Sequence, residues 1–471
     1  MTRRWLFADQ LGPQYLDHPD QPVLLIESRA VFRRRRFHRA KAHLLLSALR
    51  HRAAELGEQA LVLRVDTYDE ALAQIGEPLS VVQPTSYAAD RFVRSRGLEV
   101  LPEGRGFATT REDFDRWATG RKRLLMEDFY RWQRVRFDLL MEGTEPFGGQ
   151  WNLDHDNREP PPKRETLGLP EPWYPGEDEI DAQVRKDLDR WERDGEVSFV
   201  GVDRPRWAPT TRWEAQAALA HFVRHRLADF GPTEDAMLGA DPWMSHSALS
   251  PAINLGLLHP LECVHAAEQA YREGLAPLNS VEGYVRQVIG WREWIWSMYW
   301  HVPDGYRDRN ELAATEELPE WFRALDAGSE VTANCLGSVL RDLRERGWDP
   351  RQVTAWFHEV FVDGYDWVML PNVTGMSQHA DGGLFTTKPY AAGGAYINRM
   401  SDYCGGCAYD PKVRVGPTAC PFTAGYWAFL ERNTGRLEGN RRMRQPLMGL
   451  TRLKDLDELV VQERERGSSP P

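Results

Sequence analysis

Five short apolar segments, separated by helical patterns, fill the first hundred residues of this chain. They are four to six residues long and lie at 5–8, 22–26, 60–65, 79–82 and 98–101. Short apolar strands that alternate with helices are typical of a parallel sheet covered on both faces, with ligand space at the carboxyl ends of the strands. We therefore expect an N-terminal α/β domain with a five-stranded, Rossmann-like parallel sheet.

The turn after the first expected strand lacks the glycine-rich fingerprint of dinucleotide-binding domains. Asp9-Gln10-Leu11 stands where G-x-G-x-x-G would follow that strand. A conventional dinucleotide site is therefore not expected in this domain.

Beyond residue 103 the pattern becomes mostly helical. Residues 104–204 have the character of a connector, with one expected helix over 111–141. Helical spacing predominates from 205 onward and predicts an all-α domain over 205–462, followed by a disordered tail at 463–471. The helices expected in this domain are 211–230, 261–273, 279–300, 333–347, 351–365, 392–403 and 421–434.

The overall composition is that of a globular protein in water. The chain has 471 residues, 42% of them apolar and 27% charged, and its net charge is −11. This balance argues against a uniformly basic nucleic-acid-binding surface, although a local basic patch is compatible with it. Neither a run of eighteen apolar residues nor a secretory-signal pattern occurs. We expect a monomeric, cytoplasmic protein without a membrane partner.

Three of the five cysteines lie close together near the C-terminus. Cys404 and Cys407 are separated by two glycines, and Cys420 directly precedes a proline. A close pair of thiolates with a third beyond a turn suits a metal centre, for which Cys335 is the best fourth ligand and Cys263 the second. The alternative is that the close pair consists of small buried side chains, but a Gly-Gly interior suits a metal loop better than a core segment.

Zinc and iron–sulfur clusters both use four thiolates, so the spacing alone does not separate them. Zinc sites with four thiolates usually present two close pairs. Here one pair is joined by two single cysteines, and the last cysteine precedes Pro421, as in many cluster-binding proteins. The motif therefore favours a [4Fe–4S] cluster.

A hydroxyl-rich turn precedes an expected short helix over 252–258. Ser245, Ser247 and Ser250 lie around His246 in this turn. Serine at a helix N-terminus satisfies free backbone amides, and the same end of a helix attracts phosphate. The turn by itself thus allows two interpretations, a helix cap and a phosphate-binding site.

The segment 281–294 is an expected helix in which charges and tryptophans are mixed. Glu282, Arg286 and Glu293 alternate with Trp291 and Trp294. A solvent-exposed helix would segregate these residue types on opposite faces. The segment is therefore either a buried helix with paired charges or part of a ligand site.

Two later segments carry further candidates. Asp363 and Asp366 share a face of the expected helix that ends at Pro371, and either carboxylate can pair with Arg292. Residues 382–390 form a loop that ends in Tyr390.

Together these segments resemble the bacterial iron–sulfur branch of the photolyase and cryptochrome family. The resemblance implies an N-terminal antenna domain and a helical domain that binds FAD and a [4Fe–4S] cluster. Matching positions imply Cys335, Cys404, Cys407 and Cys420 as cluster ligands and leave Cys263 free. The matching residues extend over nearly the whole chain and are Asp9-Gln10-Leu11, 151–158, 281–293, 370–378, 381–390, 396–403 and the last three cysteines.

The resemblance also assigns residues to the flavin site. It implies that Ser247, Leu249 and Ser250 hold the FAD, and that Arg292 and Asp363 pair beside the isoalloxazine ring. The further flavin contacts are Asn254, Gln287, Trp291 and Asp366.

Two catalytic residues and an antenna follow from the same resemblance. Trp356 matches a tryptophan that relays electrons to the flavin, and Tyr390 is the second catalytic candidate. The branch uses a lumazine antenna, and Glu27, His38 and Lys41 lie near the matching segment.

The activity implied for this flavoprotein is that of a DNA photolyase, a carbon–carbon lyase. Reduced FAD would use blue light to donate an electron to a pyrimidine dimer flipped out of damaged DNA, which would then be repaired. Base flipping needs an aromatic pocket and a basic rim for phosphates. The candidate rim residues are Arg121, Lys122, Arg123, Arg441, Arg442 and Arg444.

The chain departs from the resembled branch in two places that bear on repair. The interval 336–348 contains no histidine, whereas the branch has a helix with a His-His pair there that includes the presumed proton donor. Met369 stands where the branch tends to have an acidic residue close to the flavin, and a thioether cannot exchange a proton. His246 and His379 are possible replacements for the donor.

These departures leave other functions open. The main alternative is a cryptochrome-like blue-light photoreceptor that keeps flavin and cluster but signals to a partner without repairing DNA. A zinc-stapled nucleic-acid binder without flavin is a third hypothesis, but it leaves the pattern of residues 281–390 unexplained.

Overall fold

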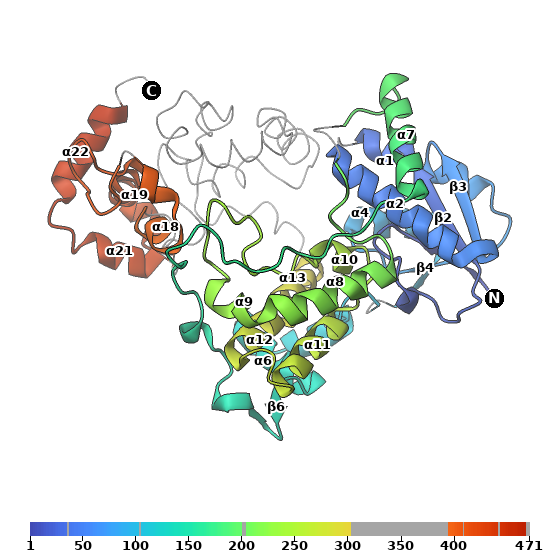
Figure 1. Cartoon of the computed structure of the whole chain (residues 1–471), viewed down its shortest axis with the longest axis horizontal. Coiled ribbons are helices and arrows are strands. Elements are labelled where there is room, and N and C mark those ends of the chain that lie inside the picture. The colour runs from blue at the N-terminus through green and yellow to red at the C-terminus, as the bar shows by residue number, and fades with distance from the viewer. Residues whose placement is uncertain are drawn as a thin grey trace. The chain divides into compact units, whose positions relative to one another are not determined.

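The computed structural model describes two compact units. The described residues are 1–34, 37–102, 105–199, 204–302, 394–407, 409–440 and 443–467 (Figure 1). The first unit comprises 1–159, 167–235 and 243–302, and the second comprises 160–166, 236–242 and 303–471. The sheet and the helices through residue 302 belong to the first unit, so the boundaries predicted at 103 and 204 fall inside it.

A five-stranded parallel sheet forms the N-terminal part of the first unit, as predicted. The strands follow the order β3-β2-β1-β4-β5. Trp5 lies between Leu24 and Val81 in register, and these side chains contribute to one core, whereas the next residue, Leu6, belongs to the core on the other face. Both faces are covered, which is why apolar residues follow one another without alternation in the central strand β2. The bounds are β1 Arg3–Leu6, β2 Val23–Ser28, β3 Ala60–Val65, β4 Leu79–Val82 and β5 Glu99–Leu101.

Helices with side-chain caps connect the strands. Thr67 and Ser86 accept hydrogen bonds from backbone amides in the first turns of α3 and α4, as N-cap residues do. A later helix, α7, packs on α2 and joins the layer that covers the sheet (Figure 1). The helices are α1 Arg29–Arg34, α2 Arg39–Leu56, α3 Tyr68–Ala73, α4 Tyr87–Ser95 and α7 Glu179–Arg193, and short 3₁₀ turns lie at Pro13–Tyr15 and Gly57–Gln59.

The single helix predicted over 111–141 is wrong, because the chain forms α5 Arg111–Ala118 and α6 Met126–Phe137 instead. Thr119 directs its amide and its hydroxyl to the carbonyl of Asp115, and Gly120 follows with a φ of 75°. A left-handed glycine after the last turn ends a helix. A hairpin of β6 Met141–Glu142 and β7 Glu145–Pro146 follows, with 3₁₀ turns at Phe147–Gly149 and Asp154–Asp156.

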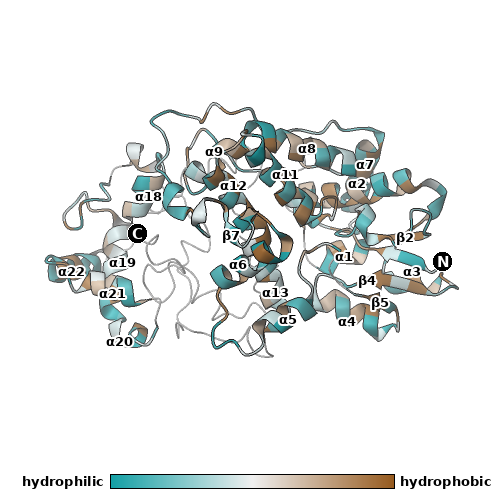
Figure 2. Ribbon diagram, turned by 90° about the horizontal axis from the view of Figure 1, so that it is seen from below, coloured by the Kyte–Doolittle hydropathy of each residue, from teal (hydrophilic) through white to brown (hydrophobic). Residues whose placement is uncertain are grey.

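The remaining helices of the first unit enclose a continuous core. The helices predicted at 261–273 and 279–300 are confirmed, whereas the one predicted at 211–230 is interrupted at Arg226. The short helix expected over 252–258 is α10, which ends earlier, at Asn254. Figure 2 shows hydrophobic residues in the interior around α6 and α12. The elements are α8 Arg212–His225, α9 Leu227–Thr233, α10 Ser250–Asn254, α11 Pro260–Arg272, α12 Leu278–Val285, the π-helix η5 Arg286–Arg292 and α13 Glu293–His301.

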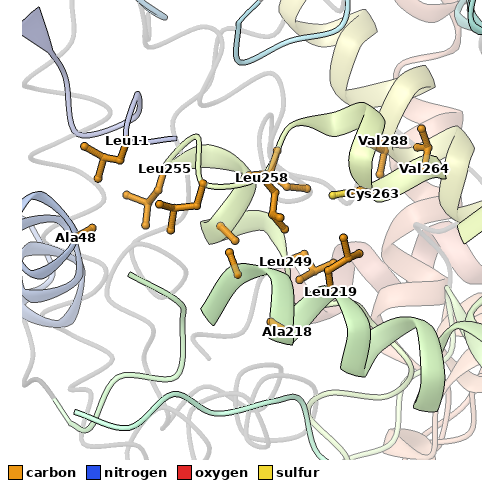
Figure 3. Packing of buried hydrophobic residues seen from close by; sticks show 14 of the residues in the cluster. Leu11, Ala48, Ala218, Leu219, Leu249, Leu255, Leu258, Cys263, Val264 and Val288 are labelled. Carbon is orange, nitrogen blue, oxygen red and sulfur yellow. The ribbon is translucent and has the colours of Figure 1, made fainter. Parts of the chain in front are cut away.

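The sheet joins the helices at the turn after β1. The amide of Leu11 donates to the carbonyl of Leu255 at 3.0 Å, and both side chains lie in the same core (Figure 3). Gly256 has a φ of 71°, and a Cβ there would lie 2.6 Å from the ring of Tyr15. A larger residue at position 256 would therefore separate the turn from the helices.

The described part of the second unit consists of short helices. They are α18 Gly394–Met400, the 3₁₀ turn η11 Tyr403–Gly406, α19 Pro421–Arg432, α20 Thr434–Leu437, α21 Arg444–Leu450 and α22 Leu456–Gly467. The helix predicted at 421–434 corresponds to α19, and that predicted at 392–403 to α18, which is shorter. The helices predicted at 333–347 and 351–365 lie outside the described residues.

The tail predicted to be disordered from residue 463 is ordered as helix up to Gly467. The side chain of Gln462 bonds both the amide and the carbonyl of Gly416, at 2.7 and 3.1 Å, and α22 packs on α19. These contacts fix the helix although its last turns contain few apolar residues. Among the described residues, no helix combines the length and the apolar character that a membrane crossing requires.

Replacing Arg50 tests a buried charge network of the sheet. Its guanidinium pairs with Glu27 of β2 at 2.7 Å and with Asp187 of α7 at 2.8 Å, and all three side chains are buried. Arg50→Met would remove the buried counter-ion and leave Glu27 and Asp187 only the exposed Arg64 and Arg190, so urea unfolding should show a loss of about 3 kcal/mol. The control Arg96→Met breaks an exposed pair with Asp69 and should cost less than about 1 kcal/mol. Equal losses in the two variants would refute a structural role for the network.

Candidate functional site

The serine-rich turn has a strained backbone that a buried arginine holds in place. Met244 and Ala248 have φ values of 45° and 54°, in the left-handed region that non-glycine residues seldom adopt. Arg226 is 2% exposed and donates to the carbonyls of Trp243 and His246, both at 3.1 Å, as well as to that of Met244. Such strain is common at binding sites. Arg226 could not be recognised from its position in the sequence, because it interrupts a pattern that predicted one helix.

Four residues predicted to contact FAD lie in or after this turn. The hydroxyl of Ser247 is half-buried and accepts a bond from the amide of Leu249 at 3.4 Å. Leu249 is 1% exposed and belongs to the hydrophobic core, so its side chain supports the turn from within. Ser250 and Asn254 on α10 are exposed. The N-cap position of α10 is Leu249, and no side chain caps that helix, so the turn presents hydroxyl groups at its surface without acting as a helix cap.

Two further predicted contacts lie on a π-helix. The helix predicted over 279–300 is continuous, but Arg286–Arg292 adopts π-helical geometry, which the sequence pattern did not reveal. Gln287 is half-buried, and Trp291 is 42% exposed at the next turn. π-Helical segments are rare and occur frequently at functional sites. The buried neighbour Val288 lies in the same core as Leu249, so the turn and the π-helix stand on common support (Figure 3).

Buried charges fix the π-helix to the connector. Arg286 pairs with Glu282 at 3.2 Å and with Asp154, and Glu282 also accepts a bond from the amide of Leu153 at 3.1 Å. Burial alone would lower the pKa of Arg286, but Glu282 and Asp154 outweigh it, and the net pKa is raised. The buried helix with paired charges is thus confirmed for these residues. The segment 151–158 contributes to this charge network through Asp154, which pairs with Arg286.

Arg292 faces the connector. Its guanidinium donates to Glu293 at 3.0 Å and to the carbonyl of Gly106 at 3.2 Å, and it lies 4.0 Å from the ring centre of Phe107. Its predicted partner Asp363 lies outside the described residues, so the pair beside the isoalloxazine ring stays a prediction.

Glu293 is a titratable group that the sequence did not single out as a site residue. Its carboxylate is completely buried and accepts a bond from the amide of Thr109 at 2.9 Å. Burial raises the pKa of Glu293 to about 7, although Arg292 and the amide act in the opposite direction. The contact between α13 and the connector therefore contains a carboxyl group that titrates near neutrality.

The tryptophans after Arg292 pack on the connector. Trp294 makes edge contacts with Phe114 and Phe129, with centroid distances of 5.8 and 5.6 Å. Trp296 stacks on Phe107 at 3.8 Å and an interplanar angle of 6°. These two large side chains fit between α13 and the residues around α5 and α6.

A small pocket lies at the carboxyl ends of β1 and β4. The strand order reverses between these two strands, which is the position where open α/β sheets bind ligands. The pocket has a volume of about 10 Å³, room for about one water molecule. Its wall includes Gln10, Gln83, Thr85, Arg105, Phe107 and Trp296.

The Asp9-Gln10-Leu11 motif connects this edge of the sheet to its surroundings. Asp9 is buried and accepts a hydrogen bond from the hydroxyl of Thr85 at 2.5 Å, while burial raises its pKa. The side-chain Nε2 of Gln10 donates to the carbonyls of Val82 and Gln83 at 3.2 and 3.4 Å. The amide of Leu11 donates to the carbonyl of Leu255 among the helices, so the motif has a structural role.

The residues near the predicted antenna segment are largely engaged in the fold. Glu27 is 3% exposed and holds Arg50 with both carboxylate oxygens, at 2.8 and 2.7 Å. His38 caps α2 by accepting a bond from the amide of Ala40 at 3.2 Å, and Lys41 is exposed. The small pocket at the sheet edge is lined by other residues, and the lumazine antenna stays a prediction.

Three predicted cluster cysteines lie around one loop of the second unit. Cys404 lies in η11, and Cys407 ends it with an amide bond to the carbonyl of Cys404 at 3.2 Å. The loop returns because Asp410 pairs with the segment 418–419, and Cys420 then caps α19. This closure brings Cys420 back toward Cys404 and Cys407, and their role as metal ligands stays a prediction.

The chemistry of these thiols fits a bound metal centre. Burial raises the pKa of Cys404, and the neighbouring Cys420 and Cys407 raise it further. Like charges oppose deprotonation of neighbouring thiols unless a cation compensates them, and metal ligation supplies that charge. The sulfur of Cys407 also accepts a bond from the amide of Tyr409 at 3.5 Å, which suits a thiolate. All three are free of disulfides.

Cys263 differs from these three. It is 0% exposed within the first unit, and burial raises its pKa to about 12. A buried thiol of this kind behaves as a small apolar residue. Its place in the core agrees with the expectation that it is not a ligand (Figure 3).

Several of the predicted site residues lie outside the part of the chain that the structure describes. Cys335, Trp356, Asp363, Asp366 and Tyr390 lie outside the described residues, as do Arg441 and Arg442. Of the other rim candidates, Arg121, Lys122 and Arg123 are exposed in the loop between α5 and α6, and Arg444 is exposed on α21.

Comparisons with known proteins identify the family. Residues 4–196 match the family described as deoxyribodipyrimidine photo-lyase-related protein. The chain is 38% identical to a (6-4) photolyase of Agrobacterium fabrum over 493 aligned positions, which cover 96% of this chain and 95% of that protein. This identity extends over nearly the full length of both. The chain therefore belongs to the photolyase and cryptochrome family.

Two solved structures are also similar to this chain. A Synechocystis cryptochrome matches at 15% identity with a TM-score of 0.46, covering 85% of this chain and 88% of that one. A bacterial class III photolyase from Agrobacterium tumefaciens matches at 18% identity with a TM-score of 0.43, covering 85% and 86%. The family assignment rests on the sequence relative.

The carboxyl group of Glu293 should make stability depend on pH. Its folded pKa is raised, so the folded state retains a proton that the unfolded chain loses, and stability should fall as pH rises from about 4.5 through about 7. Glu293→Gln should remove this part of the dependence. Urea unfolding of both proteins between about pH 5 and pH 8 should show their difference changing by roughly 1–3 kcal/mol. Glu77→Gln, in an exposed pair with Arg3, controls for general pH effects. A constant difference would contradict the raised pKa.

Proposed function

We propose that this protein is an FAD-dependent DNA photolyase that repairs pyrimidine dimers in blue light. The observation that carries the proposal is the 38% identity to a protein named (6-4) photolyase over 96% of the chain. When bound, reduced FAD supplies a light-driven electron for the dimer. The protein's own part is to bind and orient the cofactor and the flipped base.

The residues that would hold FAD are divided between the turn and the π-helix. Ser247, Ser250 and Asn254 offer hydroxyl and amide groups, and Gln287 offers a second amide. Within the part of the chain that the structure describes, the side chains of Ser250, Asn254 and Gln287 have no hydrogen-bond partner, so they are available for a ligand. Trp291, with its exposed ring, suits a flat aromatic ligand.

The other flavin residues are proposed on the family resemblance. Asp363 and Asp366 would add carboxylates, and Leu249 would support the turn from the core. Arg292 has five N–H donors, of which Glu293 and Gly106 take two, and would pair with Asp363 through another. Trp356 would relay electrons to the flavin, and Tyr390 would take part in catalysis. Arg121–Arg123 and Arg444 are proposed for the DNA-binding rim because they are exposed.

We further propose a [4Fe–4S] cluster held by Cys335, Cys404, Cys407 and Cys420. The convergence of three free thiols on one loop supports a metal centre, and the arrangement of one pair with single cysteines favours the cluster over zinc. The lumazine antenna of the branch is proposed on the family resemblance alone. We place the protein in the cytoplasm as a monomer.

A photoreceptor without repair activity is the second candidate function. The specific observation in its favour is that residues 336–348 contain no histidine, so the usual proton donor for (6-4) lesions is missing. Met369 adds to this, because it cannot replace an acidic group beside the flavin. Signalling would then take place through a protein partner.

Cofactor analysis tests the proposed binding sites. Anaerobically purified protein should contain about one FAD and about four iron atoms per chain. Cys404→Ala and Cys420→Ala should lose most of the iron, whereas Cys263→Ala should retain it because that thiol lies in the core. Iron-free protein, or equal iron in all three variants, would refute the cluster.

Repair of defined lesions separates the two candidate functions. Reduced protein is illuminated with oligonucleotides that carry either a cyclobutane dimer or a (6-4) lesion, and the products are separated by chromatography. We expect turnover of at least one lesion, and loss of about 10-fold or more in photoreduction of the oxidised flavin in Trp356→Phe. The relay is needed only to reduce the flavin, so Trp356→Phe whose flavin has been reduced chemically should still repair DNA. Absence of turnover of both lesions by flavin-loaded, reduced protein would leave the photoreceptor as the function.

A further inference from the structure

A group of three potential metal ligands lies where α7 begins, far in sequence from the cysteines. The Nε2 atom of His51 lies 3.6 Å from a carboxylate oxygen of Asp181 and 3.7 Å from one of Asp178. These three ligand atoms all lie within 4.8 Å of one another. His51 belongs to the last part of α2, and the two aspartates lie at the N-terminus of α7, which packs on α2 (Figure 1).

The imidazole of His51 is buried without a hydrogen bond at the atom that faces the carboxylates. Its side chain is 9% exposed, and Nε2 has no hydrogen-bond partner. The separations of 3.6 and 3.7 Å exceed those of a direct N–H···O bond. A buried polar atom without a partner is costly, and a cation between the three atoms would satisfy it.

The distances suit a tetrahedral ion. Zn²⁺ binds imidazole nitrogen and carboxylate oxygen at about 2.0–2.2 Å, so two ligand atoms at a tetrahedral angle lie about 3.3–3.6 Å apart. The separations at His51 agree with this range to within about 0.4 Å. An octahedral ion with similar bond lengths would need about 3 Å between adjacent ligand atoms, which agrees less well.

The capping box at the start of α7 holds both carboxylates beside His51. Arg206 donates to Oδ1 of Asp181 at 3.0 Å, and Oδ2 of Asp181, which accepts the amide of Asp178 at 3.1 Å, faces His51. The oxygen of Asp178 that faces His51, Oδ1, also accepts the amides of Ile180 and Asp181. Burial would raise the pKa of Asp181, but His51, Arg206 and the amide of Asp178 outweigh it, and the net pKa is lowered, so the group is ionised. Asp178 caps α7 through the amide of Ile180 at 2.8 Å and is 56% exposed, which gives an ion and a water ligand access.

We propose that His51, Asp178 and Asp181 bind one divalent transition-metal ion, with Zn²⁺ the best match to the donors and their spacing. The ion ties the connector helix α7 to α2 of the sheet domain. With three protein ligands, the fourth position is left to a water molecule from the exposed side. This site is independent of the flavin and the cysteine centre.

Zinc binding by matched variants tests the site. Cofactor-loaded protein is dialysed against Zn²⁺ in slight excess and desalted, and zinc is measured by mass spectrometry alongside the thermal unfolding midpoint. Wild-type protein should hold about one zinc more per chain than His51→Gln or Asp178→Asn, and only its midpoint should rise with zinc. Asp178→Asn keeps the helix cap, because asparagine is an equally good N-cap residue, so it separates loss of the ion from loss of the fold.

The control is His18→Gln. His18 and Asp20 lie 3.6 Å apart like the proposed ligands, but both are exposed, and the variant should bind zinc as wild type does. Zinc that is retained equally by His51→Gln and Asp178→Asn would lie elsewhere, for example at the cysteines, and would overturn the proposal. The absence of any additional zinc in wild-type protein would overturn it too.

Discussion

Buried arginines hold the irregular connector in place, and the rest of the first unit depends on them. A guanidinium is costly to bury unless its donors are satisfied, so each of these side chains specifies the path of the backbone around it. Arg134 is 0% exposed and donates to the carbonyls of Leu139, Leu140 and Trp151. Arg286 acts in the same way on the π-helix through its carboxylate partners.

The same principle joins the sheet domain to the helices. Arg206 bonds Asp181 of α7 at 3.0 Å and both carboxylate oxygens of Glu214 in α8 at 2.8 and 2.9 Å. A helix that covers the sheet is thereby fixed to the first long helix after the connector. The proposed metal site would strengthen this junction, because it uses the other oxygen of Asp181.

The candidate site combines such rigid support with polar groups at the surface. The serine turn is strained and held by Arg226, and the π-helix is held by Arg286, while Ser250, Asn254 and Trp291 remain exposed. Residues in this arrangement can bind a large cofactor without losing the support beneath them. The sheet edge, by contrast, has no room for a large ligand among the described residues. Phe107 and Trp296 stack on each other there, and the pocket beside them holds about one water molecule.

Much of the fold could be predicted from the sequence. The five strands follow from short apolar segments such as 22–26, because a parallel strand buried on both faces has to be apolar over most of its length. The cysteine loop was also predictable, since Cys404-Gly-Gly-Cys407 and Cys420 act through local spacing. The prediction of helix ends from the sequence failed where one or two residues decide the end, as Thr119 and Gly120 do between α5 and α6.

The sequence by itself thus determined the alternation of strands and helices, the thiol motif and the family resemblance, because these depend on residue type and spacing along the chain. Only the tertiary structure decided which charges pair, that Arg292 faces Gly106, that residues 286–292 adopt a π-helix and that His51 meets Asp178 and Asp181. These features join residues that are distant in sequence. Whether a buried charge supports a fold or a ligand depends on its partner, which spacing along one chain does not specify.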